Sequence, residues 1–440
     1  MMDELQETWQ EVLLGNERYF QLGTGGTPST EKKEYWENGT IPWLSSGEVH
    51  KKIIYEANGR ITEKGFRNSN ARFYPTHSIL IALAGQGKTR GTAAITEIEA
   101  TSNQSIAAVI PNKELVEPYF IYYFIDSLYE DLRSSSAGAG RAGLNLSILA
   151  NVSIKLPAKP IQKSVAAVLS CIDRAIEHTE ALIAKQQRIK TGLMQDLLTR
   201  GIDEHGNIRS EATHEFKDSP LGRIPKEWKS IMIDKVGSVR LGRQRSPKHQ
   251  SGRFTTPYLR VANVFDGWID YSDVLSMDFT PNEKETYSLL PNDILLNEGQ
   301  SLELVGRSAI YEGESNQFCF QNTLVRFRAF KDNHAGYCQL VFKHWLDTGR
   351  FIDVARQTTS VAHLGADRFA QMYFPRSSFE EQQRIYSVLK AKGNVIQSQK
   401  NHLKNLHQIK KGLMQDLLTG KVSVESLRAT KEQSGDAAEN

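Results

Sequence analysis

The sequence Gly192-Leu-Met-Gln-Asp-Leu-Leu-Thr199 occurs a second time as Gly412-Leu-Met-Gln-Asp-Leu-Leu-Thr419. The offset between the copies, 412 − 192 = 220, is half of the 440 residues. Eight consecutive identities at half the chain length are very improbable by chance, and the period is far too long for a solenoid. The repeat predicts a duplicated protein whose two similar halves are related by a pseudo-two-fold axis.

Each copy lies at the end of a long helical pattern, in which apolar residues recur at alternating steps of four and three. The pattern has no internal proline and predicts two coiled-coil helices, each roughly 60 Å long. Two imperfect seams of equal length are expected to pair with each other, antiparallel; the alternative is two amphipathic helices that pack separately on their own domains. The residues predicted to pair the helices are Leu169, Ile176, Ile183, Leu193, Leu197, Leu389, Ile396, Leu403, Leu413 and Leu417.

Polar residues interrupt both apolar seams. Lys392 stands where the first helix has Ile172, and Gln186 stands where the second has Leu406. The two helices are therefore similar but not interchangeable.

The segments before the two helices repeat more faintly. Framework positions match at nearly constant offsets while the residues between them differ, which predicts two modules that perform one kind of task on different targets. The matches are Trp228 at 219 after Trp9, Leu241–Pro247 at 219 after Leu22–Pro28, Pro257–Leu259 at 215 after Pro42–Leu44, and Gly306–Ile310 at 215 after Gly91–Ile95.

Short strand-like runs, a helix-like segment and many loops in these blocks indicate an α+β fold. We predict two similar globular domains separated by two long helices packed as an antiparallel coiled coil. The predicted segments are a first domain (1–156), a first spacer helix (157–200), a connector with a second domain (201–375), a second spacer helix (376–420) and a flexible tail (421–440).

Composition sets broad limits. The net charge of +3 is only a weak sign of an anionic partner. Cys171, Cys319 and Cys338 are odd in number and show no paired spacing, which predicts free thiols in a reducing compartment and argues against structural zinc. No basic, apolar start and no run near the ~18 apolar residues of a membrane span is present, so we expect a cytoplasmic protein.

The most informative charge feature is the basic run Lys235–Phe265, which contains seven Lys and Arg residues and no Asp or Glu. Such a loop suits a phosphate backbone, and arginine can also read guanine in the major groove. The alternative is a solvated basic surface loop. The residues predicted to contact DNA here are Arg243, Arg245, Lys248 and Arg253.

In the first block the corresponding candidate is Gly85-Gln-Gly-Lys-Thr-Arg-Gly91, with Lys88 and Arg90. It resembles a phosphate-binding P-loop, but Ala82 occupies the first glycine position and the residues after Gly91 are typical of a strand rather than a helix. We therefore predict a hairpin loop directed at DNA. No catalytic motif, cofactor site or metal site is recognised elsewhere.

The segments Gly192–Ile202, Phe216–Trp228 and Gly412–Lys421 resemble the specificity (S) subunit of type I restriction–modification enzymes, and with the duplicated blocks the resemblance covers nearly the whole chain. It implies two target-recognition domains, each reading one half of a split DNA site, and two conserved helices whose antiparallel coiled coil sets the distance between them. It also implies a non-catalytic subunit, without a cofactor, that recruits two methyltransferase (M) subunits and the restriction–translocase (R) subunits.

Three hypotheses follow. The first is a DNA-reading scaffold of a restriction–modification complex. The second is a coiled-coil interaction scaffold that binds helical partners and does not read DNA. The third is a fused enzyme, such as a standalone methyltransferase. The basic run Lys235–Phe265 favours the first over the second.

Overall fold

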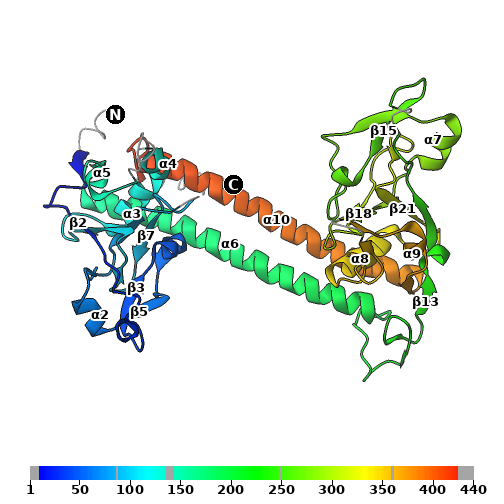
Figure 1. Ribbon diagram of the computed structural model, residues 1–440, viewed down its shortest axis with the longest axis horizontal. Helices are drawn as coiled ribbons and strands as arrows, with labels where there is room; N and C mark the ends of the chain where they lie inside the picture. Colours follow the sequence, from blue (N-terminus) through cyan, green and yellow to red (C-terminus); the bar gives the residue numbers. More distant parts are fainter. Residues whose placement is uncertain (1–8, 86–87, 135–142, 247–249, 358–360, 425–440) are drawn as a thin grey trace, which may run out of the picture. The chain divides into compact units, whose positions relative to one another are not determined.

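The computed structural model describes residues 9–85, 88–134, 143–246, 250–357 and 361–424, which divide into two compact units (Figure 1). Unit 1 comprises Met1–Ala181 with Asn401–Asn440, and unit 2 comprises Leu182–Lys400. The two longest helices, α6 (Lys159–Thr199) and α10 (Phe379–Leu417), each contribute one half to each unit. The prediction of two long helices and an α+β fold is confirmed.

Unit 1 contains a five-stranded sheet, a three-stranded sheet and a two-stranded ribbon. The larger sheet has the order β2-β9-β6-β7-β4 and the smaller one β5-β3-β8, while β1 pairs with β10. The strands are β1 (Gln10–Leu13), β2 (Phe20–Thr24), β3 (Ile41–Leu44), β4 (Ile53–Ile54), β5 (Gly59–Ile61), β6 (Ile79–Ala82), β7 (Ala93–Thr96), β8 (Thr101–Ser102), β9 (Ile106–Pro111) and β10 (Ser153–Leu156), and the shorter helices are α2 (Glu63–Arg67), α3 (Pro118–Ser127), α4 (Tyr129–Ser134) and α5 (Leu146–Ala150).

Unit 2 repeats this plan and adds two small strand groups. Its larger sheet has the order β14-β21-β17-β19, its smaller one β16-β15-β20, and β13 pairs with β24; the added groups are β18-β23-β22 and β11-β12. The strands are β11 (Phe216–Lys217), β12 (Ile224–Pro225), β13 (Lys229–Met232), β14 (Gly237–Leu241), β15 (Thr255–Leu259), β16 (Leu275–Asp278), β17 (Ile294–Asn297), β18 (Gly299–Gln300), β19 (Ser308–Ile310), β20 (Cys319–Phe320), β21 (Leu324–Ala329), β22 (Arg356–Gln357), β23 (Ala362–His363) and β24 (Tyr373–Arg376), and the shorter helices are α7 (Pro281–Tyr287), α8 (Ala335–Asp347) and α9 (Ala366–Ala370).

The strand pairing relates the units residue by residue. Ile95 pairs with Ile79 in unit 1 as Ile310 pairs with Ile294 in unit 2, so the offset of 310 − 95 = 215 that the sequence suggested is confirmed. In the smaller sheets β3 runs parallel to β8 and antiparallel to β5, and β15 runs parallel to β20 and antiparallel to β16. Two copies of one domain fold are therefore present.

One sequence match was wrong by two residues. The pairing of Gly23 with Ala108 in unit 1 corresponds to that of Arg240 with Arg326 in unit 2, an offset of 240 − 23 = 217 and not 219. Two glycines further along these segments support the offset of 217, because each lies equally close to a backbone carbonyl group. A Cβ atom added to Gly25 would lie 1.9 Å from the carbonyl oxygen of Ser102, and one added to Gly242 would lie 2.2 Å from the carbonyl oxygen of Gln321. The shared Leu-Gly letters therefore occupy shifted positions on the two strands.

Each long helix ends in the same way. Gly201 (φ +66°) follows α6 and Gly420 (φ +74°) follows α10, in the left-handed conformation that terminates helices. Added Cβ atoms would lie 2.5 Å from the ring of Trp228 and 2.9 Å from that of Trp9, so each glycine packs on the tryptophan that directly precedes β13 or β1. The Trp9 and Trp228 match is confirmed.

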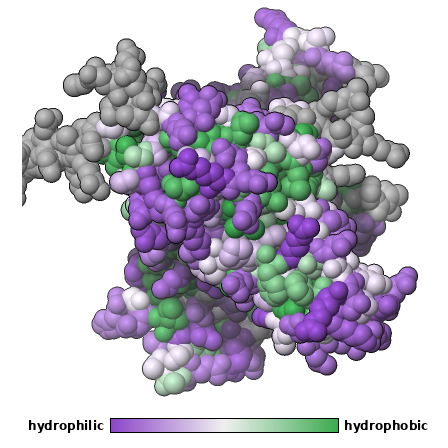
Figure 2. All heavy atoms as spheres, turned by 90° about the vertical axis from the view of Figure 1, so that its left-hand side faces the viewer, coloured by the Kyte–Doolittle hydropathy of each residue, from purple (hydrophilic) through white to green (hydrophobic). Residues whose placement is uncertain are grey.

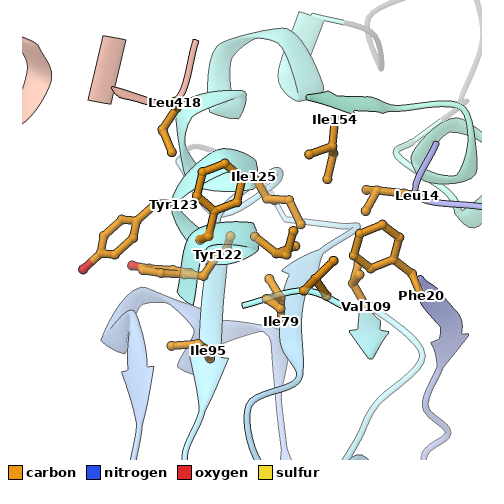
Figure 3. Packing of buried hydrophobic residues seen from close by; sticks show 14 of the residues in the cluster. Leu14, Phe20, Ile79, Ile95, Val109, Tyr122, Tyr123, Ile125, Ile154 and Leu418 are labelled. Carbon is orange, nitrogen blue, oxygen red and sulfur yellow. The ribbon is translucent and has the colours of Figure 1, made fainter. Parts of the chain in front are cut away.

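The cores lie between each larger sheet and the helices. In unit 1 the buried side chains include Ile79, Ile95 and Val109 from the sheet and Tyr122 from α3, and Figure 3 shows Leu418, which follows α10, beside them. In unit 2, Ile294 and Phe327 pack with Leu197 of α6 and Leu389 of α10. On the face in Figure 2, by contrast, polar residues cover most of the surface and apolar ones form small scattered patches.

The two long helices run antiparallel within each unit. In unit 1 the Nζ atom of Lys410 lies 2.7 Å from Oδ1 of Asp173, while Leu417 shares a cluster with Leu169, earlier on α6. In unit 2, Lys392 donates a hydrogen bond to Gln186 (3.2 Å), while Leu389, earlier on α10, packs near Leu197, later on α6. The two polar interruptions noted in the sequence thus satisfy each other.

The predicted tail begins as part of the core. Val424 is 7% exposed and belongs to the core cluster of unit 1. The rest of the predicted flexible tail, 425–440, lies outside the described residues.

Candidate nucleic-acid interface

The basic run Lys235–Phe265 follows the edge of the larger sheet of unit 2. It includes β14, which is an edge strand, the segment that leads to the smaller sheet, and β15. Lys248, one of the predicted DNA contacts, lies outside the described residues. The remaining cations of the run fall into two groups, those paired with acids and those exposed to solvent.

Arg243 belongs to the paired group. Its side chain is 8% exposed, its Nε atom donates to Oε1 of Glu283 (2.7 Å), and it also donates to the carbonyl oxygen of Asp278. Its guanidinium lies 5.0 Å from the ring centre of Phe279. These contacts hold the start of α7 against the end of β14, so Arg243 has a structural role and its charge is already balanced, contrary to the role predicted for it.

Two further cations of the run are also paired. Arg260 contacts Oδ2 of Asp273 at 2.5 Å, and Lys235 lies 3.7 Å from Asp234. The basic run alone did not reveal the ion pairs of Arg243, Arg260 and Lys235, because all three acids lie outside it. Glu283 and Asp273 follow the run, and Asp234 immediately precedes it.

Arg240, Arg245 and Arg253 form the exposed group. No ion pair involves them within the part of the chain that the structure describes, although Arg253 lies over the ring of Phe254. Exposed guanidinium groups beside an edge strand can reach phosphate oxygens or base edges. The predicted contacts Arg245 and Arg253 are therefore accessible, and Arg240 joins them.

A second group of cations was not identified from the sequence. Arg326 and Arg328 alternate on β21, next to β14, and Arg328 makes two short bonds to the buried carboxylate of Asp293 (2.6 and 2.7 Å). Arg326 is 5% exposed, and its burial, with Arg328 nearby, lowers its pKa to about 10. The spacing of two residues in Leu-Val-Arg-Phe-Arg-Ala was the signal that could have revealed them.

In unit 1 the loop after β6 carries Lys88 and Arg90. Lys88 is exposed and Arg90 is half-buried; the carbonyl oxygen of Lys88 accepts hydrogen bonds from Tyr129 of α4 and from Thr92 (both 2.9 Å). The residues that follow form β7, as predicted, and not the helix that a P-loop requires directly after its lysine and threonine.

The residues predicted to pair the helices all lie on buried or half-buried faces. Leu169, Ile176, Leu197, Leu389, Ile396 and Leu417 are buried, with exposed fractions of at most 5%, while Ile183, Leu193, Leu403 and Leu413 are half-buried.

No group of three His, Cys, Asp or Glu residues among the described residues is placed to hold a metal, and no helix among them has the length and apolarity to span a membrane. The three cysteines are unpaired, as predicted, and burial raises the pKa of the Cys319 thiol to about 11, which keeps it protonated and unreactive.

Residues 7–186 match the family model of the type I restriction modification DNA specificity domain. The chain is 23% identical over 443 residues to the type I restriction enzyme MjaVIII specificity subunit of Methanocaldococcus jannaschii, covering 96% of this chain and 94% of that protein. It is 30% identical over 152 residues to the EcoR124I/EcoR124II specificity subunit of Escherichia coli, covering 34% of this chain and 37% of that protein.

Solved structures show the same fold. The S subunit of a type I restriction–modification system from M. genitalium superposes with a TM-score of 0.55 at 16% identity, over 93% of this chain and 96% of that one. A chain from a structure of the type I restriction–modification system solved to explain its assembly superposes with a TM-score of 0.57 at 14% identity, over 94% and 98%. The family model ends at residue 186, and the strand pairing extends the likeness to unit 2.

Proposed function

Because this chain belongs to the specificity subunits of type I restriction–modification enzymes, the non-catalytic components that recognise DNA, we propose that it reads a split DNA target with two target-recognition domains, 1–156 and 201–375. The observation that carries the proposal is the duplicated fold, in which four strands of the larger sheet, the smaller sheet and the two-stranded ribbon have the same order in each unit. Two readers account for two half-sites, and the continuous spacer helices, 157–200 and 376–420, would fix the distance between them.

Cations of the two domains supply the contacts in this proposal. Arg245, Arg253 and Lys248 serve the second domain, and Lys88 and Arg90 the first. Phosphate contacts give most of the affinity and orient each domain, while side chains at base edges give the sequence preference. Arg243 acts indirectly, by holding α7 and the end of β14 in place.

The partners proposed are two M subunits together with the R subunits. Ile189 and Ile409, at equivalent positions (409 − 189 = 220), are 42% and 50% exposed, one in each unit. A large apolar side chain that is exposed at the same position of each repeat can contact one copy of the same partner, so the two positions fit two copies of that partner. A chain that reads genomic DNA must share its compartment, so we place it in the cytoplasm.

The test is an exchange of modules. Residues 1–156 end with β10, just before α6, so they can be replaced by the corresponding module of another specificity subunit without cutting either helix. Expressed with its cognate M subunit, the hybrid should methylate sites altered in one half only, as read by genome-wide methylation mapping.

The matched control exchanges 201–375 and should alter only the other half. Loss of preference in both halves after either exchange, with the protein still folded, would contradict the assignment of one half-site to each domain.

A further inference from the structure

Three arginines share one face of the larger sheet in unit 2. Arg240 of β14 lies directly opposite Arg326 of β21, and Arg328 is two residues further along the same strand. Alternate residues of a strand face the same side, so the three side chains emerge together. The alternate residues of β21, Val325 and Phe327, point to the helix side, where they belong to the main core cluster.

This group has an excess of positive charge. The carboxylate of Asp293 already forms an ion pair with Arg328. Among the residues described, no carboxylate forms an ion pair with Arg240 or Arg326. Arg326 donates weakly to the carbonyl oxygen of Thr286 (3.5 Å), and its buried Nε atom has no acceptor in the described structure. Like charges opposite each other on a strand pair are destabilising, and a buried cation without a counter-charge costs more.

A bound anion would reduce this excess of positive charge, and we propose that Arg240, Arg326 and Arg328 form the binding site for one backbone phosphate of the DNA duplex. The inference rests on the proposed function. Guanidinium groups match the geometry of phosphate oxygens, and the negative charge of a phosphodiester would offset one of the two unpaired positive charges of the group. Arg240 is exposed and gives access, while Arg326 and Arg328 are held behind it by the carbonyl oxygens of Thr286 and Ser288.

The same face of unit 1 has none of these charges. The residues at the equivalent positions are Gly23, Ala108 and Ile110, and Ala108 and Ile110 belong to or pack against an apolar cluster there. The phosphate site is therefore a property of unit 2, which should contribute more of the salt-dependent affinity than unit 1.

The experiment measures the salt dependence of DNA binding by the full chain in complex with its M subunits. The probes are a duplex with the mapped target and a scrambled duplex. Arg240→Gln should weaken binding to both by the same factor and reduce the slope of log K against log salt by about 0.9. Between 50 and 200 mM salt, the wild type should lose about 3.5-fold more affinity than the variant.

Two variants control for charge and position. Arg240→Lys keeps the charge and should keep the wild-type slope. Arg223→Gln, which removes an exposed arginine of the same unit that is paired with Glu211, should also leave the slope unchanged. An unchanged slope in Arg240→Gln would overturn the phosphate site. A wild type that binds target and scrambled duplexes equally would instead overturn the proposed function, whatever the slope.

Discussion

Unit 1 and unit 2 surround the same lysine of the repeated helix with different neighbours. In unit 1, Lys410 contacts Asp173, which also accepts a hydrogen bond from Tyr123 (2.9 Å). In unit 2 the equivalent lysine is Lys190 (410 − 190 = 220), and the position of Asp173 is taken by Gly393 (393 − 173 = 220). A Cβ atom on Gly393 would lie 3.5 Å from Nζ of Lys190, so the two positions still face each other.

Unit 2 places its own buried charge elsewhere, at the start of α10. Glu381 accepts hydrogen bonds from the guanidinium of Arg209 (2.5 Å), the indole of Trp228 (3.0 Å) and the backbone of Ile202 (3.0 Å). The equivalent position in unit 1 is Ile161 (381 − 220 = 161), which packs against the apolar core. The two long helices, which share an identical end segment, are thus fastened by the ion pair of Lys410 with Asp173 in unit 1 and by the carboxylate network at the start of α10 in unit 2, because the surrounding domains differ.

The largest effect is expected from Glu381→Ala. Both side chains of the pair are less than 10% exposed, so the change leaves the guanidinium of Arg209 buried without a counter-charge and removes the partner of Trp228. The free energy of unfolding should fall by about 3–5 kcal/mol, as measured by denaturant titration with fluorescence.

A double variant provides the control. Glu381→Leu combined with Arg209→Met removes both charges and should lose clearly less stability than Glu381→Ala. If the double variant is as unstable as the single one, the loss of stability comes from packing and not from an unpaired charge. The charge difference between Glu381 and its equivalent Ile161 would then not explain how the two units differ.

A smaller loss is expected in unit 1 from Asp173→Asn. The shape is kept, but Lys410 faces a neutral group, and because the two side chains are 10% and 14% exposed, water offsets part of the cost. We expect a loss of about 1–3 kcal/mol in the same titration. Asp196→Asn, which breaks the exposed pair with Arg200, is the control and should change stability by less than about 0.5 kcal/mol; equal losses in the two variants would show that burial of the pair is unimportant.

The repeat and the periodicity were sufficient to predict the long helices and the duplicated α+β fold, because both are local patterns carried by many residues. Three of the four framework matches between the blocks were also correct. The Leu22 and Leu241 match failed by two residues because letter identity ignores strand register, which is set by pairing with β9 and β21.

The candidate interface was less predictable. A run of like charges shows where cations are, but not which ones find an acid elsewhere in the chain. Arg243 meets Glu283, 40 residues away, whereas Arg240 meets another arginine. Those neighbours depend on tertiary packing, so the sequence located a cluster of cations but could not show that one of them, Arg243, is held in an ion pair.

The smallest effect tests the comparison in the opposite direction, by giving unit 2 the acid that it lacks. Gly393→Asp lies within α10, where replacing glycine already favours the helix slightly, and the new carboxylate can reach Lys190. A gain of about 0.5–1 kcal/mol in the free energy of unfolding is expected, part of which should disappear in 1 M salt because the pair is only half-buried. Gly393→Asn has the same shape without the charge and isolates the helix contribution, so the ion pair accounts only for the difference between the two variants. In a Lys190→Met background that difference should vanish; if it persists there, Asp gains its stability from another contact, and the two lysines are not equivalent in the way the repeat indicates.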